Sequence, residues 1–226
     1  MSQKPNKHEQ VPVFSLLIDL VDSTGNLNRL NTIERDDFLS AFADSIDPFI
    51  EELNLNDECF VNYNGDGWII SITNFSKTFE LVALAILLQH KFDSKIKEIS
   101  NINLEKNWSL RFGIAYGLDI KKTIAGRTTF LGDSIRRAKR IASLCKPNEI
   151  LTGATVNQSI YRDFETTRVD IQKRKQENEV KKFESEIDTV YTVKKIKPGL
   201  FNNYPALIHV ANEIGETKII LSLIHI

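Results

Sequence analysis

The stretch VPVFSLLIDLVDSTG, from Val11 to Gly25, decides the fold. Its first part is a nearly continuous apolar run, which is typical of a strand buried on both faces of a sheet. Asp19 interrupts this run, and a carboxylate buried there without a partner is strongly unfavourable or stays protonated. Asp19 therefore needs a positively charged partner, a bound cation or a place at the open end of the strand.

A second carboxylate, Asp66, lies in a turn signal further along the chain. The runs Cys59 to Tyr63 and Trp68 to Ile72 flank the tetrapeptide NGDG at 64–67, and Asn-Gly or Asp-Gly between β-prone runs predicts a hairpin. Asp is an ordinary turn residue, so Asp66 taken alone indicates only a turn. An aspartate at a strand end and another at a hairpin tip would together make an oxygen-only pair suited to Mg²⁺ or Mn²⁺.

The segment Asp22-Ser23-Thr24-Gly25 follows the first strand and precedes helical sequence. Its backbone N–H groups are placed either to cap a helix or to hold phosphates. The chain has no Walker A motif, and Gly113-x-x-x-Gly117 lies inside a strand pattern without the spacing of a dinucleotide fingerprint. The standard P-loop and Rossmann sites are therefore excluded.

The remaining pattern alternates helices and strands. Apolar spacing predicts helical sequence between Ile33 and Leu53, bent or restarted at Pro48, then helices over Lys77 to Ile99 and about Asp133 to Leu144. Further strands are expected at Trp108 to Gly117, Glu149 to Thr152 and Val190 to Lys194, with a charged stretch from Asp170 to Glu186. The order β-α-α-β-β-α-β-α-β-β predicts an α+β fold with a mixed or antiparallel sheet.

Composition excludes several classes of function. The 226 residues carry 29 Lys and Arg against 30 Asp and Glu, a net charge of -1, so no global field attracts nucleic acid or an anionic membrane. The longest uncharged apolar run, Leu81 to Leu88, falls short of the roughly 20 residues of a membrane helix. The first eleven residues hold no secretory signal, so we expect a cytoplasmic protein. Two cysteines and four histidines show no zinc spacing.

The helix near residue 140 has one basic face. Arg136 and Arg140 stand one turn apart, opposite the apolar side chains, and repel each other by a few tenths of a kcal/mol unless an anion lies near. Such a face is usually only solvated. The alternatives are a triphosphate or, with Arg137 and Lys139, a nucleic-acid backbone, although nucleic-acid binding leaves both aspartates unexplained.

We expect a disordered N-terminus over residues 1–10, one catalytic domain over residues 11–197 and an uncertain tail over residues 198–226. The last six residues, LSLIHI at 221–226, resemble a translated sequencing adapter and are excluded from the functional argument.

Taken in order, these segments resemble the catalytic domain of the class III nucleotidyl cyclases, the fold of adenylate and guanylate cyclases. FSLLIDLVDST is similar to the family's first strand, VNYNGDGWIISI to its metal-binding hairpin, and LRFGIAYG to the glycine-bearing strand that follows. TTFLGDSIRRAKRIASLCKPNEILTG is similar to the catalytic helix and next strand, so the match covers about Val11 to Thr152. The resemblance implies a ferredoxin-like βααββαβ core that acts as a head-to-tail homodimer, with sites shared between subunits.

The resemblance also implies roles for the matching residues. Asp19, Leu20 and Asp66 would bind two Mn²⁺ or Mg²⁺ ions, and the backbone of Leu20, Val21, Asp22, Ser23 and Thr24 would hold the nucleotide phosphates. Arg140 matches the arginine that steadies charge on the reacting phosphate. Arg136 stands where the family usually has a catalytic Asn, so it either substitutes for that residue or marks a loss of activity.

Two departures bear on the substrate. Asn62 and Thr129 stand where adenylate cyclases usually carry Lys and Asp, and guanylate cyclases Glu and Cys. An amide with a hydroxyl could read a pyrimidine edge. The chain is therefore similar to the bacterial pyrimidine cyclases of antiphage defence, the Pycsar type, which implies cyclic UMP or cyclic CMP acting on a separate effector protein, with UTP favoured. An adenylate or guanylate cyclase and a catalytically degenerate nucleotide-binding domain remain the alternatives.

Overall fold

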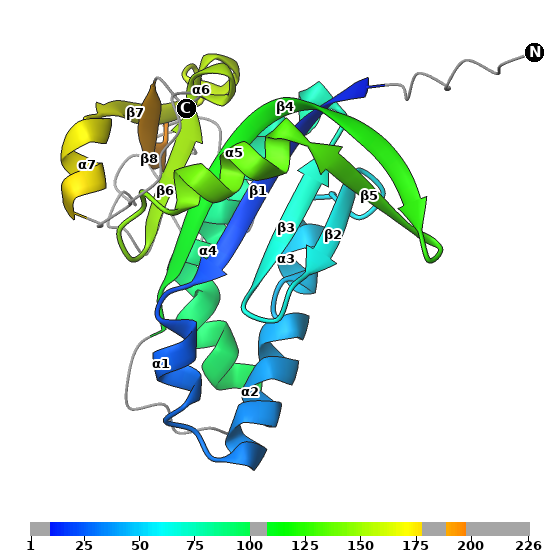
Figure 1. Cartoon of the computed structure of the whole chain (residues 1–226), viewed down its shortest axis with the longest axis vertical. Coiled ribbons are helices and arrows are strands. Elements are labelled where there is room, and N and C mark those ends of the chain that lie inside the picture. Colours follow the sequence, from blue (N-terminus) through cyan, green and yellow to red (C-terminus); the bar gives the residue numbers. More distant parts are fainter. Residues whose placement is uncertain (1–9, 100–107, 178–188, 198–226) are drawn as a thin grey trace, which may run out of the picture.

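The strand that contains Asp19 runs through the middle of a mixed eight-stranded sheet (Figure 1). The computed structural model describes residues 10–99, 108–177 and 189–197. The sheet has the order β2-β3-β1-β4-β6-β8-β7, and β5 pairs with β4. The strands are β1 (Gln10–Leu20), β2 (Cys59–Tyr63), β3 (Gly67–Ile72), β4 (Leu110–Ile124), β5 (Arg127–Gly132), β6 (Glu149–Gly153), β7 (Phe164–Val169) and β8 (Val190–Ile196).

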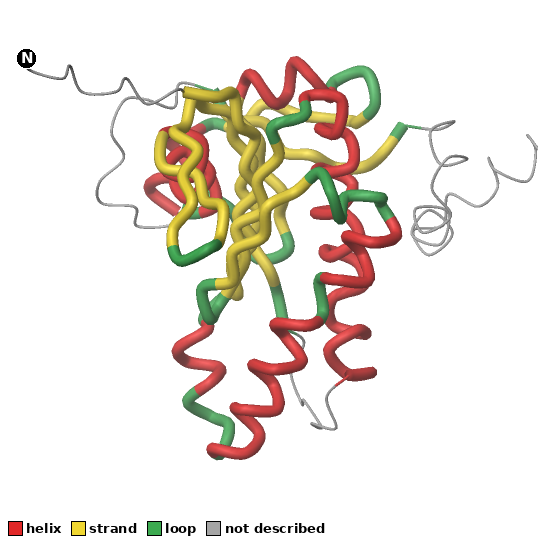
Figure 2. The backbone as a smooth tube through the Cα atoms, turned by 90° about the vertical axis from the view of Figure 1, so that its right-hand side faces the viewer, coloured by secondary structure: helices red, strands yellow, loops and turns green. Residues whose placement is uncertain are grey.

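The helices lie on both sides of this sheet, as the edge-on view of Figure 2 shows. They are α1 (Ser23–Leu27), α2 (Thr32–Asp44), α3 (Asp47–Glu52), the 3₁₀ turn η1 (Phe75–Lys77), α4 (Thr78–Ile99), α5 (Asp133–Ala142), α6 (Ala154–Ile160) and α7 (Ile171–Glu177). Strand β1 pairs antiparallel with β3 and with β4, whereas β4 and β6 are parallel, so the sheet is mixed as predicted.

Side-chain alternation along β1 divides the interior into two layers. Phe14, Leu16 and Ile18 face the larger core, which includes apolar side chains of α2, α3 and α4. Leu17 faces a smaller core that includes Ala138 and other apolar side chains of α5. Both faces of β1 are thus covered, which explains its continuous apolar sequence. Asp19 lies one residue before the end of this strand.

The predicted hairpin and the helices expected at about 77–99 and 133–144 are confirmed within a few residues at each end. The helical sequence between 33 and 53 divides at Ser45 and Ile46, and Pro48 lies in the first turn of α3, where its missing N–H is harmless. The strand expected to end at Gly117 continues to Ile124 and returns as β5. The sequence pattern also missed α1, α6, β7 and α7.

The predicted disordered N-terminus is wrong at its last residue, because Gln10 already pairs with Ile120 in the sheet. Residues 1–9, the tail at 198–226 and the part of the charged stretch at 178–186 lie outside the described residues. Within the described ranges, no helix is both long enough and apolar enough to cross a membrane.

Candidate functional site

The structure brings Asp19 and Asp66 to the same edge of the sheet. Asp19 pairs in register with Gly67 of β3, the residue that follows Asp66. The backbone N–H of Leu20 donates to the carbonyl oxygen of Asp66 at 2.9 Å, and the Ser23 hydroxyl donates to Asp66 Oδ2 at 3.1 Å. The tip of the β2–β3 hairpin is therefore tied to the loop that leaves β1.

Close backbone contact at Gly67 makes this arrangement possible. A Cβ atom on Gly67 would lie 2.1 Å from the carbonyl oxygen of Ile18, a distance that no side chain tolerates. Gly65, at the tip of the turn, has φ of 94°, a conformation that glycine adopts without strain. The two glycines of the NGDG sequence thus have different roles. Gly65 adopts the left-handed conformation of the turn, and Gly67 lets β3 lie close to the backbone of β1.

Asp19 has a partner that the sequence did not reveal. The guanidinium of Arg111, on the neighbouring strand β4, donates a short hydrogen bond to Asp19 Oδ2. Burial raises the pKa of Asp19 above its usual value, the charge and hydrogen bond of Arg111 counteract that rise, and the charge of Asp66 adds to it. Asp66 therefore lies close enough to Asp19 for their charges to interact.

The loop after β1 has the shape of a bent strand-to-helix connection. Asp22 adopts the left-handed conformation with φ of 51°, which Asp tolerates better than most residues. Asp22 occupies the N-cap position of α1, as the helix-cap interpretation of this segment predicts, but its side chain makes no capping hydrogen bond to the helix. The N–H groups in the first turn of a helix have no partner within that helix. The phosphate-binding role of residues 20–24 stays a prediction.

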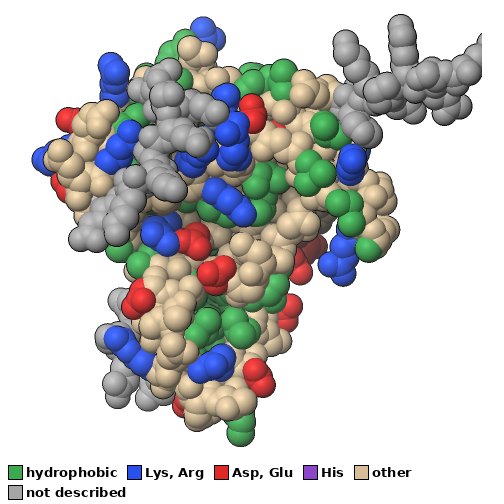
Figure 3. Space-filling view, in the orientation of Figure 1, with side chains coloured by type: hydrophobic (Ala, Val, Ile, Leu, Met, Phe, Trp, Pro, Cys, Tyr) green, Lys and Arg blue, Asp and Glu red, His purple; other side chains and the backbone are tan. Residues whose placement is uncertain are grey.

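Helix α5 carries the predicted basic face on the other side of the sheet from the larger core. Figure 3 shows Lys and Arg side chains gathered over this helix. Arg136 donates to Asp133 Oδ1 at 2.7 Å, and Arg137 lies 3.7 Å from the other oxygen of the same carboxylate. This hydrogen bond from Arg136, reinforced by the charges of Arg136, Arg137 and Arg140, lowers the pKa of Asp133 against a smaller opposing effect of burial. The spacing of three and four residues could have predicted these contacts from the sequence.

Among the described residues, the charges that shift the pKa of Asp19 do not include the arginines of α5. The charged groups that shift the pKa of Asp19 are Arg111 and Asp66, whereas Arg136 and Arg140 act on Asp133. The two aspartates and the arginines of α5 thus act in two separate groups of interacting charges among the described residues.

The comparisons with known proteins concern the fold. No protein-family model matches the chain, and neither does any curated protein. Among solved structures, the adenylyl cyclase CyaB from P. aeruginosa matches with a TM-score of 0.70 and 14% identity, covering 85% of this chain and 98% of that one. The guanylyl cyclase Cya2 matches with a TM-score of 0.69 and 14% identity, covering 85% and 96%. The guanylate cyclase domain of RhGC from Catenaria anguillulae, in complex with GTP, matches with a TM-score of 0.63 and 16% identity, covering 84% and 100%.

This is the class III nucleotidyl cyclase fold. The expected fold class is therefore confirmed.

Within this cyclase fold, Asn62 and Thr129 lie on two strands that approach each other. Asn62 is on β2 and Thr129 on β5, and both are partly exposed. The rings of Phe60 and Phe130 meet edge to face with centroids 5.0 Å apart, which joins the two strands. Alternation puts Asn62 on the Phe60 face of β2 but puts Thr129 on the face opposite to Phe130. The structure gives no hydrogen bond between Asn62 and Thr129, so their joint contact with a base stays a prediction.

The carboxylates of this cyclase fold fit a divalent cation bound with a nucleotide. Within the described residues, no three His, Cys, Asp or Glu side chains gather as a metal site. Mg²⁺, however, is commonly held by one or two carboxylates together with substrate phosphates. Asp19 and Asp66 supply that number of carboxylates at one sheet edge, beside the backbone of the loop at 20–24.

Proposed function

We propose that this protein is a nucleotide cyclase that converts a pyrimidine nucleoside triphosphate, UTP in preference to CTP, into the 3′,5′-cyclic monophosphate and pyrophosphate. The observation that carries the proposal is the meeting of Asp19 and Asp66 at one edge of a class III cyclase sheet. Two carboxylates 47 positions apart in the sequence gain nothing for stability from lying together, because each charge disfavours the other.

The residues of the chain divide the chemistry between them. Asp19 and Asp66, with Leu20, would hold two divalent cations, Mn²⁺ or Mg²⁺. Such ions lower the pKa of the attacking ribose 3′-hydroxyl and neutralise charge on the triphosphate. The backbone from Leu20 to Thr24 orients the phosphates. Arg140 donates to the α-phosphate as negative charge grows there during in-line displacement of pyrophosphate.

The two polar side chains in the base-reading positions support a pyrimidine. Asn62 and Thr129 lack the charges with which the family reads purines, and an amide can present either a donor or an acceptor to the base. The substitution pair Asn62→Lys with Thr129→Asp restores the adenylate pattern and is expected to shift the product towards cyclic AMP. Asn62→Glu with Thr129→Cys is the matched control and is expected to favour cyclic GMP.

A head-to-tail homodimer completes the site. Within one chain the aspartates and Arg140 belong to separate clusters, so a catalytic set requires a second copy. If the dimer has two shared sites, mixing the strongly impaired variants Asp19→Ala and Arg140→Ala restores activity. In a one-to-one mixture half the dimers are mixed and half of their sites intact, which gives about a quarter of the wild-type rate. No recovery in the mixture contradicts shared sites.

The decisive experiment is product identification. The purified protein is incubated with Mn²⁺ and equal amounts of ATP, GTP, CTP and UTP, and cyclic products are identified by mass spectrometry. Cyclic UMP or cyclic CMP that disappears in Asp19→Ala supports the proposal. A cyclic purine nucleotide as product supports the cyclase reaction but contradicts the pyrimidine preference. Full activity of Asp19→Ala contradicts the role of Asp19 in metal binding.

The pyrimidine product would act as a diffusible messenger. We place the enzyme in antiphage defence, where the cyclic nucleotide activates a separately encoded effector. In bacteria that carry the gene and its neighbours, phage infection is expected to raise cyclic UMP, and Asp66→Ala is expected to abolish both that rise and the protection.

A nucleotide-binding domain without turnover is the second candidate. It is favoured by Arg136, which replaces the family's usual Asn and pairs with Asp133, and by Arg111, which occupies an oxygen of Asp19. Nucleotide binding measured by calorimetry, with no release of pyrophosphate from any of the four triphosphates, would select this candidate over the cyclase.

A further inference from the structure

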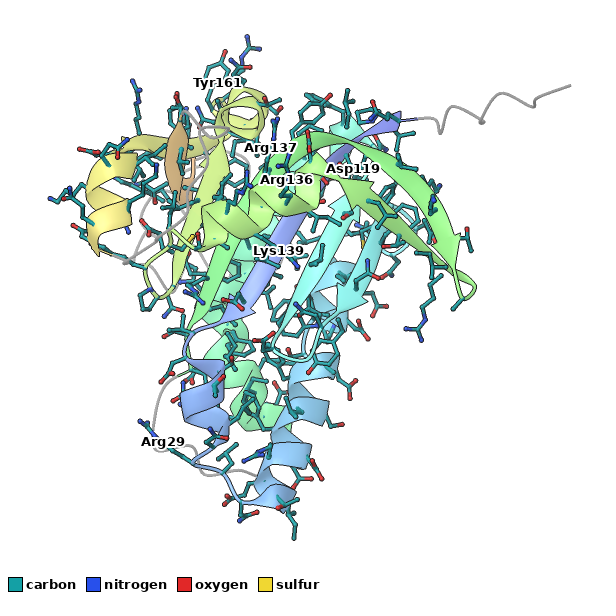
Figure 4. All side chains as sticks on the ribbon, in the orientation of Figure 1. Arg29, Asp119, Arg136, Arg137, Lys139 and Tyr161 are labelled. Carbon is teal, nitrogen blue, oxygen red and sulfur yellow. The ribbon has the colours of Figure 1, made fainter. Side chains whose placement is uncertain are left out.

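Helix α5 is held at its start by a carboxylate from another element. Gly132 stands at its N-cap position and has no side chain to accept a hydrogen bond from the first turn. Asp119 on β4 does so instead. Its Oδ1 accepts from the backbone N–H of Ser134 at 2.9 Å, and its Oδ2 accepts from the Ser134 hydroxyl at 2.5 Å. Figure 4 shows Asp119 beside this end of α5, with Arg136 and Arg137 on the same helix.

Asp119 also ends a buried chain of hydroxyl groups. Asp119, Ser134, Ser15 and Ser71 are all completely buried. Ser134 gives its one hydroxyl proton to Asp119, so the 2.7 Å contact between Ser134 and Ser15 uses the proton of Ser15. The 2.9 Å contact between Ser15 and Ser71 then uses the proton of Ser71. The Asp119 carboxylate on β4 thus sets the direction of the hydrogen bonds made by Ser134, by Ser15 on β1 and by Ser71 on β3.

Two glycines of β4 fix the remainder of the helix against the same strand. A Cβ atom on Gly117 would lie 2.4 Å from the backbone nitrogen of Ser134, and one on Gly113 would lie 2.2 Å from the carbonyl oxygen of Ala138. The backbone of α5 therefore rests directly on β4. With so little space beneath it, α5 is positioned by its first-turn hydrogen bonds and cannot slide without losing them.

The buried row of hydroxyl groups links the strand that carries Asp19 to the helix that carries the arginines of the same subunit. Ser15 lies on β1, four residues before Asp19 and on the same face of the strand. Ser134 lies on the helix that carries Arg136 and Arg140. We propose that Asp119 is a positioning residue that keeps α5, and with it Arg136 and Arg140, in a fixed register on β1 and β4. The effect on catalysis rests on the proposed cyclase function, whereas the anchoring of α5 does not.

The test uses one conservative variant and one matched control in the full chain. Asp119→Asn keeps an oxygen that accepts from the Ser134 N–H. It presents an amide donor to the Ser134 hydroxyl, so this hydroxyl no longer donates to residue 119 and the serine hydroxyl groups lose the acceptor that orients them. Thr152→Val on β6 is the control, because Thr152 is also completely buried and its hydroxyl makes no hydrogen bond to any residue that the structure describes. Hydrogen–deuterium exchange of the first turn of α5 and the kinetics of cyclic nucleotide formation are measured for each.

We expect the first-turn amides of α5 to exchange at least about tenfold faster in Asp119→Asn and unchanged in Thr152→Val, because Ser134 then keeps only one of its two hydrogen bonds to residue 119 and loses the one to a charged acceptor. We expect kcat to fall about tenfold with KM within about twofold, because the arginines act on the transition state. In the Arg140→Ala background, the same Asp119→Asn change is expected to lower kcat less than about twofold, since its effect passes through Arg140.

Wild-type exchange in Asp119→Asn overturns the anchor. An equal fold loss of kcat in the wild-type and Arg140→Ala backgrounds overturns positioning through Arg140. If Asp119→Asn does not fold, Ser134→Ala replaces it, because it removes only the hydroxyl and leaves the Ser134 N–H on Asp119. If the wild-type protein makes no cyclic nucleotide, the proposed function fails, and the exchange experiment alone decides whether Asp119 anchors α5.

Discussion

Replacing Arg111 by Met tests whether a cation competes with Arg111 for Asp19. The two side chains are 31% and 27% exposed, so their ion pair is partly desolvated. Removal of one partner from such a charged hydrogen bond costs about 1.5–3 kcal/mol of unfolding free energy. At about 2–4 °C per kcal/mol for a chain of this size, the melting temperature is expected to fall by about 3–12 °C.

Binding of a divalent cation to Asp19 should then restore the unfolding free energy that Arg111→Met removes. In the wild-type protein, Mn²⁺ must displace Arg111 from Asp19, which weakens binding by about 10- to 100-fold if the full 1.5–3 kcal/mol opposes it. Without Arg111, Mn²⁺ at 100 times its dissociation constant adds about 2.7 kcal/mol of stability. Thermal unfolding across a Mn²⁺ titration measures both quantities.

A second ion pair provides the matched control. Arg174 donates to both oxygens of Glu149 at 2.8 and 2.7 Å, and its side chain is also largely buried. Arg174→Met is expected to lose a similar amount of stability without any response to Mn²⁺. In the double variant Arg111→Met with Asp19→Asn, the response to Mn²⁺ should disappear. Equal Mn²⁺ responses of Arg111→Met and the wild type, or a response of Arg174→Met, would refute the reasoning.

Three further substitutions and one pH-dependent measurement test the structure. Gly67→Ala is expected to prevent folding, because its Cβ would lie 2.1 Å from a β1 carbonyl oxygen, whereas Gly65→Ala faces open space and costs about 1 kcal/mol in urea unfolding. Burial raises the pKa of Cys59 to about 11 from 9.0, so iodoacetamide alkylation should still accelerate between pH 9 and 11. The stability that the buried thiol contributes is complete below pH 9 and is lost as the pH rises through about 11. Asp133→Asn should change the unfolding free energy by less than about 1 kcal/mol, because its pair with Arg136 is exposed.

Local signals were sufficient for most of the fold. The apolar run of β1 and the NGDG turn are each predicted from a local segment of fewer than 15 residues, and the structure contains both. The arm formed by the end of β4 and by β5 was missed because residues 121–127 are all exposed and polar or small apart from Ile124, so no alternation marks the strands. Strand β7 was missed for the same reason, since Phe164 is its one fully buried side chain.

The contacts of the candidate site could be predicted from the sequence only in part. Asp19 was conspicuous as a charge in an apolar strand, but its partner Arg111 lies 92 positions away and faces it only through the register of β1 and β4. No property of one sequence gives that register. Asp119 had the same signal as Asp19, a carboxylate following the apolar run LRFGIAYGL, and the rule applied to Asp19 would have singled it out as a residue in need of a buried partner.

The two aspartates of the apolar strands are satisfied in opposite ways. Asp119 is completely buried, and both of its oxygens are occupied by one serine whose position does not depend on any ligand. Asp19 remains about a quarter exposed, shares its edge with the charge of Asp66 and has a flexible arginine on one oxygen. A fixed partner suits a structural anchor, and a displaceable partner suits a residue that exchanges one cation for another. The same residue type therefore holds the helix at one place and, in the proposed function, is available for a metal ion at the other.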